Sequence, residues 1–337
     1  MQPIETVEMH TGGEPVRIVV AGYPSLPKSS LLERRRYALE HHDELRRFLM
    51  HEPRGHFDMY GAVPLAADAP PSQSDGADFA VLFLHNEGYS TMCGHAVIAL
   101  GRWAVDSGRV AKVEPETRLR VQCPCGVVRV RVEVNSGKAG RVRFESVPAF
   151  ALALDRAVEV PGLGRLEVDI GYGGAFYAVL PAQRLGLDLG RAPVAAIVDR
   201  ASRVSEAVKA QVPIRHPDDP DLGYLYGTIV TDGGDGTLSP SRNVCVFADR
   251  QVDRSPTGSG VTARIALARA RNAVALGQEC RFESLTGATF TGKALRAAQC
   301  GSHQAVVVEV GGSAHYSGTA RFTREADDPL RAGFLLR

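Results

Sequence analysis

The sequence predicts a mixed α/β protein of the α+β class, built from two similar halves. Alternating and compact apolar runs typical of strands are interrupted by a few segments with helical apolar spacing. A short motif also recurs, since residues 93–97 (CGHAV) and 257–261 (TGSGV) share the form X-Gly-X-small-Val, about half of the chain apart. Each copy follows a strand and a loop and opens a helix, so we expect two equivalent halves that serve one site. Two unrelated helix starts are the alternative.

The order of elements follows from apolar period and turn residues. Helices are expected where apolar residues recur every three to four positions, at 31–50, 96–105, 206–211 and 261–270. Strands are expected where apolar residues alternate or form short runs bounded by turn residues, at 4–9, 16–21, 79–84, 119–134, 141–144, 166–170, 225–231, 242–248, 304–310 and 318–323. The stretch 150–164 is rich in Pro and Gly, and we interpret it as a break between the halves.

Composition limits the class of protein. The 337 residues are 44% hydrophobic, which is enough for two domains with buried cores. A formal net charge of +1 argues against nucleic acid or an anionic membrane as the main partner. The one basic run, 34–36, stands among glutamates and is interpreted as a solvated helix face. Neither a long apolar span nor a basic, apolar leader is evident, so we expect a cytoplasmic protein.

The six cysteines are too few and too scattered for a disulfide scaffold, so we expect thiols. Cys93 is the candidate for reactivity, because it directly precedes a predicted helix and the helix N-terminus lowers a thiol pKa from its reference of about 8.5. The alternative for Cys93 is a buried structural role. Cys123 and Cys125 lack a second ligand pair with zinc spacing, so a metal site there is disfavoured. The other three are Cys245, expected in the core, and Cys280 and Cys300, expected near strand or turn edges.

The two helix starts predict an anion site. Free N–H groups and the positive end of the helix dipole favour a carboxylate, and the glycines at 94, 258 and 260 allow close approach. His95 could act as a base, as a donor to substrate or only as a helix-start residue. Asp253 could pair with a cationic amine, or could cap the turn that contains Ser255.

These motifs resemble the proline racemase family. The resemblance lies in MCGH at 92–95 and DRSPTGSG at 253–260, with further matches at 10–15 (HTGGEP), 52–61 (EPRGHFDMYG), 327–330 (DDPL) and 333–334 (GF). Because these segments extend from residue 10 to residue 334, the resemblance covers essentially the whole chain.

The resemblance implies a diaminopimelate epimerase-like fold, with two similar domains, each a mostly antiparallel sheet rolled around a central helix, and the active site between them. The implied domains are 1–157 with 318–337, carrying Cys93, and 158–317, carrying Thr257. It implies neither cofactor nor metal. By resemblance, the residues that contact the substrate carboxylate and amine are Gly94, His95, Asp253, Gly258 and Ser259.

Thr257 departs from the racemase pattern, which places a second cysteine there. A threonine hydroxyl has no pKa near neutrality, so two-base racemisation is disfavoured. Within this family, the Cys-plus-Thr pairing resembles that of members that dehydrate trans-3-hydroxy-L-proline to Δ1-pyrroline-2-carboxylate. In that substrate the hydroxyl and the Cα hydrogen share a ring face. One residue, Cys93, could therefore take the proton and return it to the leaving hydroxyl.

Other functions remain open on the sequence. On the same scaffold, proline racemase or 4-hydroxyproline 2-epimerase activity is the nearest alternative. A non-catalytic amino-acid-binding protein and a metal-dependent hydrolase are more distant ones. The expected partner is a small hydroxyproline-like imino acid, with no nucleic acid and no membrane, and a homodimer is left open.

Overall fold

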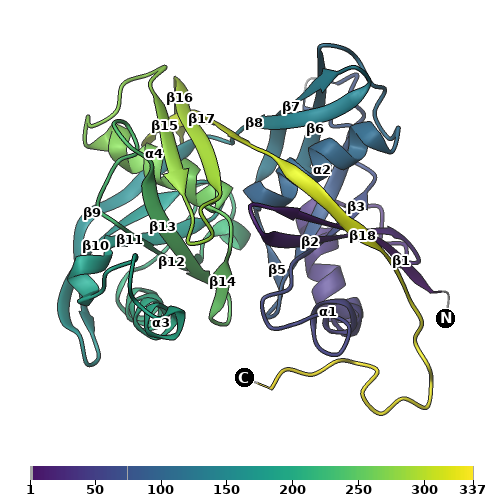
Figure 1. The fold of residues 1–337 in the computed structure, drawn as a ribbon, viewed down its shortest axis with the longest axis horizontal. Coiled ribbons are helices and arrows are strands. Elements are labelled where there is room, and N and C mark those ends of the chain that lie inside the picture. The colour runs from purple at the N-terminus through teal and green to yellow at the C-terminus, as the bar shows by residue number, and fades with distance from the viewer. Residues whose placement is uncertain (1–2, 74, 337) are drawn as a thin grey trace. The chain divides into compact units, whose positions relative to one another are not determined.

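The structure is a computed structural model that describes residues 3–73 and 75–336. The chain divides into two compact units (Figure 1). Unit 1 comprises Met1–Val142 and Ser313–Arg337, and unit 2 comprises Arg143–Gly312. The predicted junctions differ from these. The one after residue 157 falls inside a continuous strand, β9 (Ala149–Val160), and the one before residue 318 falls inside another, β18 (Ala314–Phe322).

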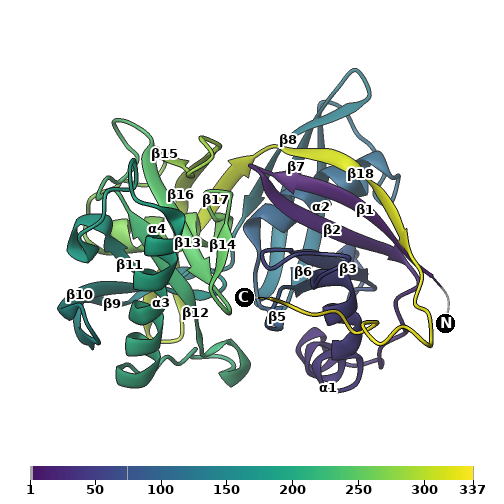
Figure 2. The ribbon, with the colours of Figure 1, turned by 60° about the horizontal axis from the view of Figure 1, so that its bottom comes forward.

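Unit 1 is a twisted sheet with a long outer helix and a buried inner one. Its elements are β1 (Ile4–Thr11), β2 (Glu14–Ala21), α1 (Leu31–Met50), β3 (Gly61–Leu65), β4 (Phe79–Leu84), β5 (Tyr89–Ser90), α2 (Gly94–Asp106), β6 (Glu116–Cys123), β7 (Gly126–Asn135) and β18, while β8 (Lys138–Glu145) leads from unit 1 into unit 2. Strand β1 pairs antiparallel with β2 and with the last strand, β18, which lies beside it in Figures 1 and 2. The sheet continues through β3, β4, β6 and β7.

Unit 2 is a closed ring of strands. Its elements are β9, β10 (Gly164–Tyr172), β11 (Phe176–Pro181), the 3₁₀ turn η1 (Ala182–Leu185), α3 (Val194–Gln211), the 3₁₀ turn η2 (Pro220–Leu222), β12 (Leu225–Thr231), β13 (Ser241–Phe247), β14 (Gln251–Asp253), α4 (Gly258–Ala270), β15 (Glu279–Glu283), β16 (Thr289–Cys300) and β17 (His303–Gly312). Pairing runs β9–β10–β11–β12–β13–β15–β16–β17 and returns to β9 through Ala305 and Phe150. Only β11–β12 and β13–β15 are parallel steps.

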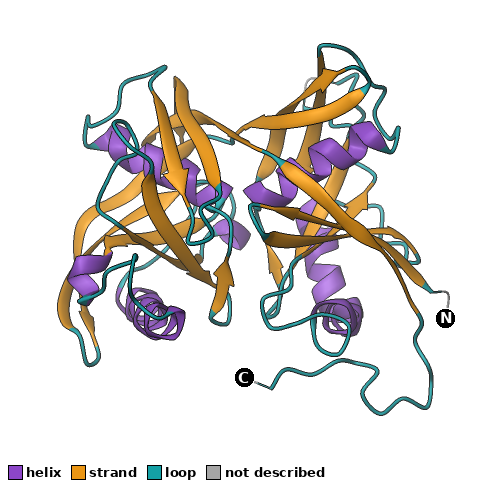
Figure 3. Cartoon of the chain, viewed as in Figure 1, coloured by secondary structure: helices purple, strands orange, loops and turns teal. Residues whose placement is uncertain are grey.

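The two inner helices, α2 and α4, are closely alike. Each begins at the glycine of the recurring motif and spans 13 residues, most of them buried. Helix α2 packs on β1, β2, β7 and β18, and α4 packs on β9, β10, β16 and β17 (Figure 3). Each copy of the motif therefore follows a strand and a loop and opens a helix, as the sequence predicts.

Several predicted elements were correct and others were wrong. Helix α1 has the predicted bounds, and a capping box between Ser30 and Glu33 fixes its start. The predicted break at 150–164 is wrong, because Pro161 and Gly162 form only the turn between β9 and β10. The basic run is also only partly solvated, because Arg34 is buried and forms an ion pair with Asp68. No helix in the described residues is long and apolar enough to cross a membrane.

Candidate active site

Cys93 is the N-cap residue of α2 in unit 1. Its backbone is extended, and its Sγ accepts a hydrogen bond from the N–H of Ala96 at 3.4 Å. The side chain is buried, and Sγ lies 3.2 Å from Nδ1 of His95. A thiol in contact with both an imidazole and a helix N-terminus can exchange a proton with either a ligand or the imidazole.

His95 is held in place by unit 1 residues. Its carbonyl accepts a hydrogen bond from Oγ1 of Thr11 at 2.9 Å, which ties the start of α2 to the end of β1. Its ring contacts the ring of Tyr60 edge-on, with 4.8 Å between centroids. The hydroxyl of Tyr60 in turn lies 2.6 Å from Oγ of Ser90. The sequence interpretation missed Ser90 and Tyr60 as supports, although Tyr60 falls within one of the motifs quoted for the family.

Among the described residues, the other cysteines lack the surroundings that would make a thiol reactive. All six are free thiols, as predicted. Burial raises the pKa of Cys125 to about 12. Burial, and then the neighbouring Cys125 and Cys93, hold the pKa of Cys123 well above its usual value. Burial also raises the pKa values of Cys280 and Cys300 to about 11. These thiols stay protonated at neutral pH, and none of them caps a helix in the described chain.

Thr257 is the N-cap residue of α4 in unit 2, and its conformation is unusual. Its φ of 64° lies in the left-handed region, which β-branched residues rarely adopt. Its side chain makes no capping hydrogen bond, and Oγ1 is buried without a partner among the described residues. A buried hydroxyl without a partner costs about 1–3 kcal/mol, and such groups occur where a ligand supplies the missing bond.

A chain of hydrogen bonds holds the strained loop before α4. Oδ1 of Asp253 accepts the N–H of Ser255 at 2.7 Å, and Oγ of Ser255 accepts the N–H of Thr257 at 3.1 Å. The turn-capping alternative for Asp253 is thus observed, and it leaves a ligand-binding role open. Nδ2 of Asn243 donates to the carbonyl of Pro256 at 3.1 Å.

Arg264 anchors this network from inside α4. Its guanidinium is buried and donates to Oδ1 of Asn243 at 2.8 Å, and to Oγ of Ser241 and the carbonyl of Gly234, each at 2.7 Å. Burial lowers its pKa to about 10. The sequence interpretation missed Arg264 and Asn243; a single arginine inside an otherwise uncharged helix segment, 258–267, was the available signal.

The first turn of α4 is closely packed. A Cβ on Gly260 would come within 2.6 Å of Cδ1 of Ile229 and 3.0 Å of Cγ2 of Thr257, so a larger residue there would displace these side chains. The hydroxyl of Ser259 lies 2.7 Å from the hydroxyl of Tyr177. Tyr226 packs between Tyr177 and Phe247, with ring centroids 5.8 and 5.1 Å away, so aromatic residues adjoin this helix start.

The structure therefore places the predicted site residues at two helix starts, one in each unit. Unit 1 brings together Cys93, Gly94 and His95 at the start of α2. Unit 2 brings together the other four at the start of α4, namely Asp253, Thr257, Gly258 and Ser259. Each helix leaves first-turn N–H groups without intrahelical acceptors, as an anion site requires.

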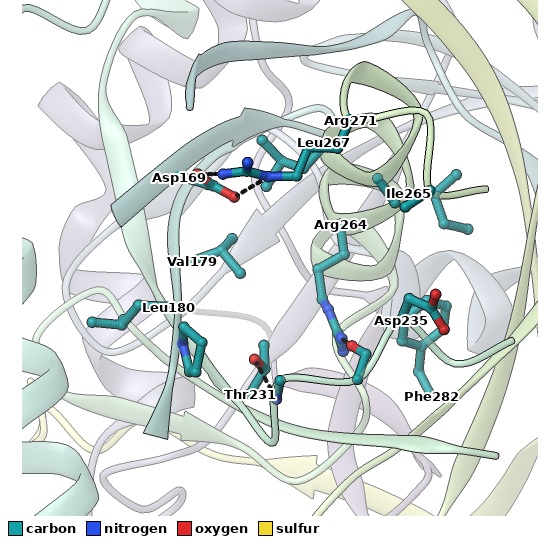
Figure 4. Close-up of a pocket in the computed structure, with 15 residues that line it drawn as sticks. Asp169, Val179, Leu180, Thr231, Asp235, Arg264, Ile265, Leu267, Arg271 and Phe282 are labelled. Atoms are coloured by element: carbon teal, nitrogen blue, oxygen red, sulfur yellow. Dashed lines mark hydrogen bonds and ion pairs between the residues drawn. The ribbon is translucent and has the colours of Figure 1, made fainter. Parts of the chain in front are cut away.

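A pocket elsewhere in unit 2 contains none of these seven residues. It has a volume of about 500 Å³ and lies against the side of α4, lined by Arg264, Arg271, Asp169 and Asp235 together with apolar side chains (Figure 4). Arg271 is paired with Asp169 there. This pocket adjoins the Arg264 network rather than the helix start.

These observations define a two-unit α+β protein with a thiol–imidazole pair at one central helix and a strained threonine at the other. The chain belongs to the proline racemase family, whose model, described as proline racemase, matches residues 6–335. Its solved relatives include a hydroxyproline epimerase from Agrobacterium vitis with bound trans-4-hydroxy-L-proline. The match has a TM-score of 0.91 and 26% identity over 99% of this chain and 96% of that one.

Two curated relatives are closer in sequence. The chain is 57% identical to the trans-3-hydroxy-L-proline dehydratase of Homo sapiens over 99% of this chain and 95% of the relative. It is 44% identical to a 3-hydroxyproline 2-epimerase of Burkholderia multivorans over 99% of this chain and 98% of the relative.

Proposed function

We propose that this protein is a hydro-lyase that converts trans-3-hydroxy-L-proline into Δ1-pyrroline-2-carboxylate and water. The similarity to the human dehydratase, at 57% identity over nearly the full length of both chains, supports the substrate and the reaction. The single structural observation that supports the proposal is that α2 begins after a cysteine, Cys93, and α4 after a threonine, Thr257, so only one of the two helix starts offers a thiol.

In the proposed mechanism Cys93 serves as both base and acid. Its thiolate removes the Cα proton, the electron pair forms the Cα–C3 double bond, and the C3–O bond breaks. Because the leaving hydroxyl is on the same ring face, the same thiol returns the proton to it and water leaves. The resulting enamine tautomerises to the imine. The contact of Sγ with His95 and with the start of α2 supports a thiol able to ionise. This chemistry requires neither a cofactor nor a metal.

The remaining predicted residues are proposed to bind the substrate. N–H groups at the helix starts, at Gly94 and His95 and at Gly258 and Ser259, would stabilise the carboxylate and the charge that spreads into it during proton removal. Asp253 would pair with the cationic ring nitrogen. We further propose a diaminopimelate epimerase-like fold in which both loops serve one substrate. The matching inner helices and the strand ring around α4 support it.

Incubation of the purified protein with trans-3-hydroxy-L-proline tests the reaction. We expect a pyrroline product that reacts with o-aminobenzaldehyde, and no optical change with L-proline or the 4-hydroxyprolines. Because one relative is named 3-hydroxyproline 2-epimerase, the assay must also measure the 2-epimer of the substrate. If the 2-epimer of the substrate accumulates without the pyrroline, the proposal of a hydro-lyase is wrong.

Replacement of Thr257 by valine tests whether the Thr257 hydroxyl serves ligand binding or the stability of the fold. We expect kcat/KM to fall about 2–10-fold, the value of one hydrogen bond, while the free energy of unfolding stays equal or rises by about 1 kcal/mol. The reason is that Oγ1 is buried without a partner in the described chain. Steady-state kinetics and urea denaturation measure the two effects.

The matched control is Thr262→Val on the same helix. Oγ1 of Thr262 donates to the carbonyl of Gly258 at 3.0 Å, so its removal should lower the free energy of unfolding by about 1 kcal/mol. Equal losses of stability in the two variants, with unchanged kinetics for Thr257→Val, would assign the Thr257 hydroxyl a structural role.

A further inference from the structure

A histidine, an aspartate and a cysteine, three residue types that bind metals, lie close together in unit 2. All three are distant in sequence from the starts of α2 and α4. His216 and Asp218 lie in the loop between α3 and η2, and Cys300 is the last residue of β16. Sγ of Cys300 lies 3.8 Å from Nε2 of His216 and 3.8 Å from Oδ2 of Asp218. The three ligand atoms all lie within 4.8 Å of one another.

The two separations of 3.8 Å from Sγ of Cys300 are close to those of a tetrahedral zinc site, and the third pair of ligand atoms lies within 4.8 Å. With Zn–S near 2.3 Å and Zn–N or Zn–O near 2.0–2.2 Å, tetrahedral geometry places neighbouring ligand atoms about 3.3–3.6 Å apart. A mixed set of thiolate, imidazole and carboxylate suits Zn²⁺ better than the hard cations Mg²⁺ and Ca²⁺, which prefer oxygen ligands alone. A shift of a few tenths of an ångström would bring the sulfur into place.

Aromatic rings and a neighbouring turn pack closely around the His216, Asp218 and Cys300 side chains. The ring of His216 packs against the rings of Tyr172, Phe150 and Phe176, with centroids 4.6, 6.1 and 6.4 Å away. The β16–β17 turn presses on the same loop, since a Cβ on Gly301 would come within 2.4 Å of Cβ of Pro217. Cys300 is buried, whereas Asp218 is exposed and leaves a path for an ion from solvent.

We propose that His216, Asp218 and Cys300 bind one Zn²⁺ ion, with water as the fourth ligand. The ion replaces the proton of the Cys300 thiol, which passes to solvent, and Nε2 of His216 supplies a lone pair. In the structure Nδ1 of His216 accepts the N–H of Asp218 at 3.2 Å. Zinc at Nε2 moves the ring proton to Nδ1, so this contact opens on binding. The site links the 216–218 loop to the end of β16 and takes no part in the proposed dehydration.

Cobalt(II) provides a direct readout, because a cobalt–thiolate bond gives a near-ultraviolet charge-transfer band. We expect the metal-free full-length protein to bind one equivalent of Co²⁺ with such a band, and Zn²⁺ to displace it. Zn²⁺ should also raise the melting temperature. Cys300→Ser should abolish the band, and the exposed Asp218→Asn should weaken Co²⁺ binding at least tenfold without unfolding the chain.

Two other thiol variants serve as controls. Cys280→Ser removes another buried strand thiol of unit 2, and Cys93→Ser removes the thiol beside His95. Both should keep the band. A band that survives in Cys300→Ser, that disappears in Cys93→Ser, or that never forms in the unaltered protein would overturn the proposal. The dehydration assay plays no part in this test, so its outcome is independent of the proposed function.

Discussion

Replacement of Cys93 by serine is expected to lower kcat/KM for dehydration by about 10²–10⁴-fold, the usual contribution of a general acid–base group. A serine hydroxyl at the start of α2 keeps the shape and the contact with His95, but it does not ionise near neutral pH. Stopped assays of pyrroline formation, with circular dichroism to confirm folding, measure the effect.

The matched control is Cys280→Ser. This thiol is also buried, but it lies in β15 rather than at the start of either inner helix. The folded variant should retain the kcat of the unaltered protein. Full turnover in Cys93→Ser would exclude the single-thiol mechanism and would require another base.

Replacement of Thr257 by cysteine is expected to produce the second-largest change, a new activity. A thiol with a reference pKa of about 8.5 at the start of α4 would provide a second proton-exchanging group, in the motif position that Cys93 has at α2. Cysteine is not β-branched, so it also fits the positive φ at this position with less strain.

We expect racemisation of L-proline to rise at least about 10²-fold above the rate of the unaltered protein. Chiral chromatography of D-proline and deuterium incorporation at Cα in heavy water measure it. Thr257→Ser, which keeps a hydroxyl and relieves the same β-branching, should show no gain. Equal gains in the serine and cysteine variants would contradict a role for the new thiol.

Local patterns predicted much of the fold, and long-range contacts account for what was missed. Helix α1 and the strand β4 have the predicted bounds because their caps and apolar runs are continuous in sequence. Strand β9 was mistaken for a break because its closing turn contains Pro161 and Gly162. Of its two partners, β10 is adjacent in sequence, whereas β17 lies far away and no local signal identified that pairing.

In the candidate site, too, local sequence patterns predicted some features and long-range contacts account for those that were missed. The motif predicted Cys93 and Thr257 as helix-start residues, and the structure places both as N-caps. The positive φ of Thr257 could not be inferred, because the network that imposes it joins Asn243 and Arg264 across separate elements. The His216–Cys300 pair is 84 residues apart in sequence, too far for a short ligand-spacing motif to indicate it.

The closed strand ring of unit 2 has a consequence for the order of folding. Its last junction joins β9 to β17, where Phe150 pairs with Ala305 across most of the unit. Closing so long a loop is entropically costly before other contacts form, so this step belongs late in folding. Helix α4 packs on both of these strands. We therefore expect α4, which begins after Thr257, to gain its full packing only once β17 has been synthesised and has closed the ring.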